Sequence, residues 1–148
     1  MQGIEALRLP LDQYLDWASY DLPPDSEYNR IVSLSKSAFM KASQIYINRA
    51  TLNEGQPLLL EDLRHIVSQV HPDEPGSHAL VWVCFIAAAD STDPEQRQYF
   101  MDRMNRIFAK TRFENIRTAV RSLPGIWRQQ DSGRWTKDLI RLAPTLVM

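Results

Sequence analysis

The sequence predicts an all-α fold, a bundle of about six to seven helices around a central apolar helix at residues 78–91. Apolar residues recur at intervals of three and four through most of the chain, which is the spacing of one helix face. No sustained run alternates apolar and polar residues as a half-buried strand would. Proline and glycine mark the breaks between helices, at Pro23-Pro24, Gly55 to Pro57, Pro72 to Gly76, Asp93-Pro94, Pro124-Gly125 and Ser132-Gly133.

Three helices are expected in the first half of the chain. The first is short, at residues 11–20, and the second is long, near residues 26–52, where Asp25 or Ser26 can cap the exposed amides. The third is expected at about residues 58–70, with acidic side chains in its first turns, where the helix dipole favours negative charge. Its buried stripe consists of Leu59, Leu63, Ile66, Val67 and Val70.

The predicted fourth helix, at residues 78–91, is apolar on all sides and reads HALVWVCFIAAADS. A helix without a polar face is buried all round, so this helix is the expected centre of the bundle. Its β-branched residues would also suit a strand, but the run from Ala87 to Ala89 favours a helix. Ser77 is the expected N-cap.

The remaining helices are predicted from clear start and stop signals. The fifth opens at Asp93, which is a good cap, followed by Pro94 at the first helical position and Gln96 at the capping-box position. The sixth begins near Phe113, and Pro124 is expected to kink or end it, because proline lacks the amide donor. A last helix is expected near residues 134–142.

Composition excludes several classes of protein. A net charge of -1 gives no overall field toward nucleic acid or membrane. The single cysteine, Cys84, excludes an internal disulfide and a cysteine-based zinc cluster. The N-terminal sequence lacks the pattern of a secretory signal, and the longest apolar run, residues 79–89, is too short to cross a bilayer. We therefore expect an intracellular protein, nuclear or cytoplasmic, without a membrane partner.

The two ends of the chain differ in charge. Residues 1–93 carry 6 basic and 13 acidic residues, a net of -7, whereas residues 94–148 carry 11 basic and 5 acidic residues, a net of +6. Complementary surfaces within one fold are the simplest interpretation, and a basic patch for an acidic partner is the alternative. No direct nucleic-acid binding is expected, because no aromatic residues interleave the basic stripes. These stripes are Arg103, Arg106 and Lys110 on the fifth helix and Arg117 and Arg121 on the sixth.

Motifs that would indicate a reaction are absent from the sequence. The histidines His65, His71 and His78 match no zinc spacing, and there is no nucleophile elbow and no phosphate-binding glycine loop. Neither a metal nor a cofactor is expected. Cys84 lies inside the apolar helix, where a thiol is inert. Asp90 is expected to form an ion pair with Arg97, across the corner to the next helix.

An apolar ligand site remains open beside a plain core. Helical bundles that are rich in aromatic, methionine and alanine residues can enclose a pocket. The same residues at helical spacing also form ordinary cores. The candidate lining consists of Trp82, Phe85, Phe100, Met104 and Trp127.

Residues 78–97, HALVWVCFIAAADSTDPEQR, resemble a region of fungus-specific transcription factor domains that reads roughly H-x-L-x-W-P-L-F-I-A-G-x-E, followed by a proline and an arginine. Two flanking segments agree with this family. Residues 42–49, ASQIYINR, are similar to its A-x-x-I-Y-x-x-R helix, and residues 115–127 resemble a later segment that ends in tryptophan. The matching residues in the central region are His78, Leu80, Trp82, Phe85, Ile86, Ala87, Asp90 and Arg97.

The departures from the family pattern refine what the resemblance implies. Val83 and Ala88 replace the usual proline and glycine, which should make the central helix more regular. The six-cysteine zinc cluster is missing, so no DNA-binding module is expected. The family domain is usually longer. Residues 1–148 are therefore interpreted as a single helical regulatory-type domain, either the C-terminal part of a longer domain or a small separate protein.

By this resemblance the leading hypothesis is a regulatory domain that binds a small apolar ligand or a protein partner, including a second copy of itself. One alternative is a small fungal secondary-metabolism enzyme of the cyclase or isomerase type on a repurposed regulatory fold. Its acid and base groups would be His78, Asp90 and Arg97. Another alternative is a dimerisation module, which requires a large apolar patch on a two-fold interface.

Overall fold

A computed structural model describes residues 27–130 and 135–138, and every element in these ranges is helical. The all-α prediction is confirmed, whereas the count of six to seven helices is not. The expected helix at residues 11–20 lies outside the described residues, and of the expected last helix only a short 3-10 turn is described. Within the described ranges there are five α-helices, α2 (Glu27–Leu52), α3 (Pro57–Ser68), α4 (Val81–Asp90), α5 (Pro94–Thr111) and α6 (Glu114–Gln129), and two 3-10 turns, η1 (Ser77–Leu80) and η2 (Trp135–Asp138).

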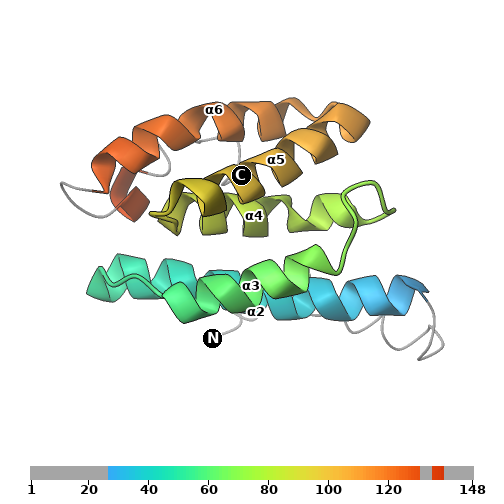
Figure 1. Ribbon diagram of the computed structural model, residues 1–148, viewed down its shortest axis with the longest axis horizontal. Coiled ribbons are helices and arrows are strands. Elements are labelled where there is room, and N and C mark those ends of the chain that lie inside the picture. Colours follow the sequence, from blue (N-terminus) through green and yellow to red (C-terminus); the bar gives the residue numbers. More distant parts are fainter. Residues whose placement is uncertain (1–26, 131–134, 139–148) are drawn as a thin grey trace, which may run out of the picture.

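The helices lie in layers around α4 (Figure 1). In that view α2 and α3 lie side by side at the bottom, α4 lies above them, and α5 and α6 lie at the top. Every residue of α4 except Trp82 is buried. The prediction of a central helix that is apolar on all sides is therefore confirmed, because α2 packs on one side of it and α5 and α6 pack on the other.

The beginning of the central helix differs from the prediction. Residues 77–80 form η1, and the α-helix starts only at Val81. Gly76 precedes η1 with φ 88°, a left-handed conformation that glycine adopts without strain. Ser77 is not an N-cap as predicted, because its buried hydroxyl donates instead to the carbonyl of Pro72, at 2.6 Å, and closes the preceding loop.

The two helices that follow differ in how their predicted boundaries compare with the structure. Asp93 caps α5 as expected, since its carboxylate accepts the amide of Gln96 at 3.0 Å. Pro124, however, does not end α6, which continues to Gln129. Leu123 and Ile126 on either side of the proline are fully buried, so packing holds this turn in place despite the lost hydrogen bond.

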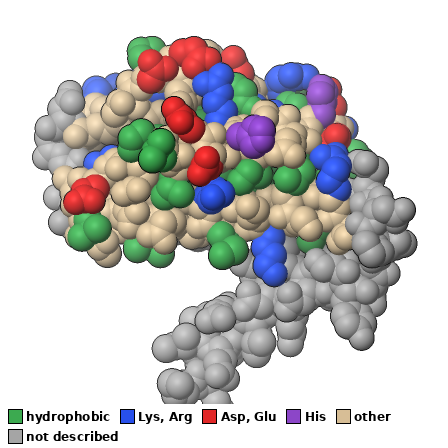
Figure 2. All heavy atoms as spheres, turned by 60° about the horizontal axis from the view of Figure 1, so that its bottom comes forward, with side chains coloured by type: hydrophobic (Ala, Val, Ile, Leu, Met, Phe, Trp, Pro, Cys, Tyr) green, Lys and Arg blue, Asp and Glu red, His purple; other side chains and the backbone are tan. Residues whose placement is uncertain are grey.

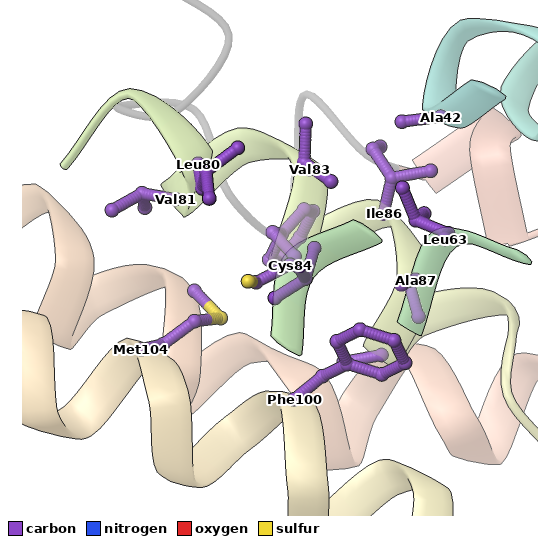
Figure 3. Packing of buried hydrophobic residues seen from close by; sticks show 14 of the residues in the cluster. Ala42, Leu63, Leu80, Val81, Val83, Cys84, Ile86, Ala87, Phe100 and Met104 are labelled. Carbon is purple, nitrogen blue, oxygen red and sulfur yellow. The ribbon is translucent and has the colours of Figure 1, made fainter. Parts of the chain in front are cut away.

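The core consists of apolar side chains that all five α-helices contribute. In the close view of Figure 3, Phe100 and Met104 of α5 point toward the α4 side chains around Cys84. Leu63 of α3 meets Ile86 of α4 on the other side of the cluster. Side chains of α3 and α5 thus pack directly against those of α4.

Candidate functional site

The last residue of α4, Asp90, is a buried carboxylate that joins three elements. Its side chain is 0% exposed, and its Oδ1 atom accepts two hydrogen bonds. The Nε atom of Arg49 on α2 donates at 2.8 Å, and the indole of Trp135 on η2 donates at 3.0 Å. The second oxygen, Oδ2, is buried and accepts no hydrogen bond from the described residues. One acidic side chain thus fixes the relative positions of α2, α4 and η2.

Burial raises the pKa of Asp90, and the hydrogen bonds from Arg49 and Trp135 oppose that shift. Arg49 is itself held in place, because its Nη1 atom donates to the carbonyl and the side chain of Asn53 at 3.3 and 3.2 Å. Removing either Asp90 or Arg49 would leave the charge of the other without its partner, which is costly in a low-dielectric environment.

Side chains of α6 satisfy the carbonyl groups at the C-terminal end of α4. The last carbonyls of a helix have no partner within that helix. Here the indole of Trp127 donates to the carbonyl of Ala88 at 2.8 Å, and the amide of Gln130 donates to the carbonyls of Ala89 and Ser91. The end of α4 is therefore ordered by residues that lie about forty positions later in the chain.

The expected ion pair between Asp90 and Arg97 was a wrong prediction. Arg97 donates instead to the carbonyl of Ser91 at 2.8 Å and to the side chain of Gln130 at 2.6 Å. Its guanidinium also lies 4.7 Å from the Trp127 ring. The carboxylate is taken by Arg49 from α2, a long-range contact that spacing along the chain does not reveal.

The three groups that the enzyme hypothesis requires do not meet. His78 lies on η1, exposed, with its ring edge-on to Phe113 at 6.4 Å. Asp90 lies at the opposite end of α4 and is committed to Arg49 and Trp135. An acid and a base that act on one substrate must lie within reach of the same reacting atoms, and this arrangement does not provide that.

The five candidate pocket residues occupy different environments. Phe85, Phe100 and Met104 are 0% exposed and pack in the core. Trp82 is partly exposed and stacks on Phe39 of α2, with ring centroids 4.9 Å apart. Trp127 is partly buried and lies at the C-terminal end of α4, where its indole donates to the carbonyl of Ala88. The structure therefore places three of these residues in the core and the two tryptophans at its edges.

A surface hollow between α2 and α3 was not predicted. Its volume is about 220 Å³. Met40 in its lining is 66% exposed, and each of the two helices carries a further exposed apolar side chain, Ile47 of α2 at 50% and Leu58 of α3 at 76%. Figure 2 shows this face, with apolar side chains lying among charged ones. The hollow is lined by Ser37, Met40, Lys41, Gln44 and Leu59.

One signal in the sequence could have located this face. Met40, Gln44 and Ile47 are spaced by four and three residues, so they share one side of α2. That side is not the core stripe of α2, which contains Ala38, Ala42 and Ile45. Apolar residues away from the core stripe of an amphipathic helix are informative because they predict an exposed apolar surface.

Neither a metal centre nor a membrane span is found in the part of the chain that the structure describes. No three acidic, histidine or cysteine side chains in residues 27–130 and 135–138 gather closely enough to hold an ion. Among the same residues, no helix combines the length and the apolar character needed to cross a bilayer. Cys84 is fully buried, and burial raises the pKa of its thiol to about 12.

Comparison with known proteins gave one match. A sequence profile described as the fungal specific transcription factor domain matches residues 4–146. This range contains the segments in which the motif resemblance was seen, so the predicted resemblance is confirmed. No curated protein and no solved structure matched the chain.

Proposed function

We propose, from the premise that the chain belongs to the fungal specific transcription factor domain family, that it binds a protein partner through the face of α2 and α3. Membership of the family supports a regulatory role, and we place its action in the nucleus. The observation that carries the proposal is the exposed Met40 in the lining of the hollow, together with exposed Ile47 on the same helix and exposed Leu58 next in the chain to the lining residue Leu59. Exposed apolar clusters of this kind are typical of interaction sites.

The size of the hollow favours a protein side chain over a complete small ligand. Pockets for drug-sized molecules usually measure roughly 300–1,000 Å³, and this hollow measures about 220 Å³. Met40 and Lys41 on its rim have long, flexible side chains that can adapt to an inserted group. Of the five candidate pocket residues, Phe85, Phe100 and Met104 are fully buried, and none of the five lines this hollow.

The shape of the face suits a partner helix. Ser37, Met40, Gln44 and Ile47 follow one side of α2 over about 15 Å of helix axis. Leu58 and Leu59 of α3 lie alongside, so the strip is bordered by two helices. An amphipathic helix binds such grooves through apolar residues three and four positions apart. A second copy of the chain is one candidate for this partner, as the dimerisation alternative requires.

A reporter assay tests the proposal directly. The complete chain is fused to an unrelated DNA-binding domain, and reporter transcription is measured for the wild type and for the double variant Met40→Lys/Leu58→Lys. Both positions are exposed, so the fold should persist, whereas the apolar contact is lost. We expect the reporter response to fall to the level of the DNA-binding domain alone. Asn105→Lys, an exposed change on α5, serves as the matched control and should leave the response unchanged.

Native mass spectrometry of the purified chain separates the remaining possibilities. A dimer that the double variant abolishes would identify the partner as a second copy. A retained apolar compound that only denaturing extraction releases would favour ligand binding and contradict the partner proposal. An unchanged reporter response in the double variant would also contradict it.

A further inference from the structure

The two basic stripes predicted on α5 and α6 have different surroundings. On α5, Arg103 is only 8% exposed and donates to the carbonyl of Val70. Lys110 donates to the carbonyl of Asp73, and Arg106 lies 3.6 Å from the carboxylate of the same residue. The basic residues of α5 thus attach that helix to the loop between α3 and η1 and are already engaged.

The basic residues of α6 remain on the surface. Arg117, Arg121 and Arg128 are exposed, and their spacing of four and seven residues puts them on one side of the helix. Arg117 lies 3.9 Å from Glu114, a contact between two exposed side chains. Over residues 27–130 and 135–138, neither Arg121 nor Arg128 forms an ion pair. This stripe is available to a partner.

The turn that leads into this stripe departs from local preferences at two successive residues. Arg112 ends α5 with φ 60°, a left-handed position that glycine or asparagine usually occupies. Phe113 stands at the N-cap of α6, where serine, threonine or aspartate is preferred, and it is 52% exposed. Neither choice favours the fold locally, and such departures are expected at functional positions.

Aromatic rings hold the cations at this corner. The guanidinium carbons of Arg112 and Arg117 lie 5.8 and 6.0 Å from the centre of the Phe108 ring. Phe113, the residue after Arg112, lies edge-on to the His78 ring. The corner therefore presents two positioned cations next to an exposed aromatic side chain.

We propose that this corner and the adjoining stripe of α6 bind an acidic segment of a partner protein. Carboxylates one helical turn apart would pair with Arg117 and Arg121, about 6 Å apart along the axis. An apolar side chain of the same segment, beyond the carboxylate that pairs with Arg117, would cover Phe113 at the start of α6. The surface is distinct from the α2–α3 face and does not depend on the function proposed for that face.

Charge favours a protein over a nucleic acid. On this surface the four cations Arg112, Arg117, Arg121 and Arg128 outnumber the one anion, Glu114, which complements an acidic segment. The whole chain, however, carries -1, and Glu114 lies within the stripe itself. A phosphate backbone would bring a dense row of charges against that carboxylate, whereas a peptide can place its carboxylates selectively.

Fluorescence anisotropy with the complete chain tests this proposal. The probe is a labelled synthetic helix with glutamate on its polar face and leucine on its apolar face. Charge reversal in Arg117→Glu/Arg121→Glu should weaken binding at least about tenfold. Arg64→Glu, a charge reversal on α3 at a residue that does not line the hollow, should change the dissociation constant by less than about twofold. Phe113→Ala should also weaken binding, and a probe with glutamine in place of glutamate should not bind.

Three results would overturn the proposal. Equal weakening by Arg64→Glu and by the α6 variant would show a general attraction between opposite charges and no specific site on α6. Tighter binding of single-stranded DNA than of the peptide would assign the surface to nucleic acid. Unchanged binding in the α6 variant would show that the stripe is not the binding site. Met40→Lys/Leu58→Lys should bind the peptide normally, so this test and the reporter test can fail independently.

Discussion

At the scale of single residues, Asp90 combines a stabilising role with a cost. Its carboxylate accepts hydrogen bonds from Arg49 and Trp135, yet burial opposes its ionisation. A buried ion pair contributes little more to stability than apolar residues in its place would. Removing only one of the two charged residues, however, lowers stability strongly. Asp90 is therefore a sensitive position, although it takes part in no proposed binding surface.

Replacing Asp90 should reveal this cost. Asp90→Ala removes the acceptor of both donors and should lower the free energy of unfolding by about 3 kcal/mol. Asp90→Asn keeps an acceptor oxygen and should cost about 1 kcal/mol. Urea unfolding monitored by circular dichroism measures both variants. Glu95→Gln, which alters the exposed pair with Arg64, is the control and should have a smaller effect than Asp90→Ala.

The pH dependence of Asp90 has a definite sign. Its pKa is raised above 3.8 in the folded state, so the unfolded chain releases this proton at lower pH than the folded chain does. The contribution of Asp90 to stability is complete below pH 3.8 and falls as the pH rises through the folded pKa. The stability of the wild type relative to Asp90→Asn should therefore decrease with pH across this window. An increase would contradict the direction of the shift.

Cys84 should be chemically silent in the folded protein. Burial raises the pKa of its thiol to about 12, and Arg103 nearby opposes the shift only in part. The thiolate is the reactive form, so a disulfide reagent at neutral pH should modify the protein only through unfolding. The measurement is the rate at which the disulfide reagent modifies Cys84, with and without urea. The thiol that the reagent releases reports this rate. Rapid reaction under native conditions would show that α4 opens locally.

Sequence reasoning succeeded at this scale where the interaction is local. Asp93 caps an amide three residues away, and the pattern that predicts this contact is complete within α5. It failed for Asp90, whose donors lie 41 and 45 residues away on α2 and η2. Arg49 was noticed only as part of a motif, because nothing in its own neighbourhood indicates a buried partner.

At the scale of elements, the turn between α5 and α6 gives a direct prediction. Arg112 has φ 60°, which costs an L-residue with a side chain about 1 kcal/mol relative to glycine. Arg112→Gly should therefore raise the free energy of unfolding by up to about 1 kcal/mol, after the greater freedom of glycine in the unfolded chain is counted. The same variant should bind the acidic probe more weakly. A loss of stability would contradict the account of this turn.

Helix boundaries were predicted well only where packing agreed with the local signals. The proline in α6 predicts a break, yet Leu123 and Ile126 are buried beside it and the helix continues. The apolar pattern from His78 predicts one helix, yet residues 77–80 adopt a tighter 3-10 turn. In both places tertiary contacts outweigh propensities of a few kcal/mol or less.

At the scale of the whole molecule, Trp135 ties the end of the described chain to the core. Its side chain is 0% exposed, lies edge-on to Tyr46 of α2 and donates to Asp90. Trp135→Ala should cost about 3–5 kcal/mol, as is usual for buried aromatic truncations. This is a large share of a typical domain stability of about 5–15 kcal/mol. Thermal unfolding measures it, and a loss below about 1 kcal/mol would show that η2 is dispensable.

The overall architecture could be predicted because it depends on patterns that extend over whole helices. The unbroken apolar stretch of α4 identified the centre of the bundle without any structural information. The binding surfaces could not be predicted in the same way, because each is assembled from two elements. Leu59 of α3 and Met40 of α2 line the hollow together, and the α6 corner brings Phe108 of α5 to Arg117 of α6.

The burial of nearly all of α4 also constrains how the protein is made. Synthesis proceeds from the N-terminus, so this apolar helix leaves the ribosome before α5 and α6, which cover it. Trp127 and Gln130, which satisfy its terminal carbonyls, arrive later still. Until about forty more residues have emerged, the nascent chain presents its most hydrophobic segment to the surroundings, the state in which growing chains most need chaperones.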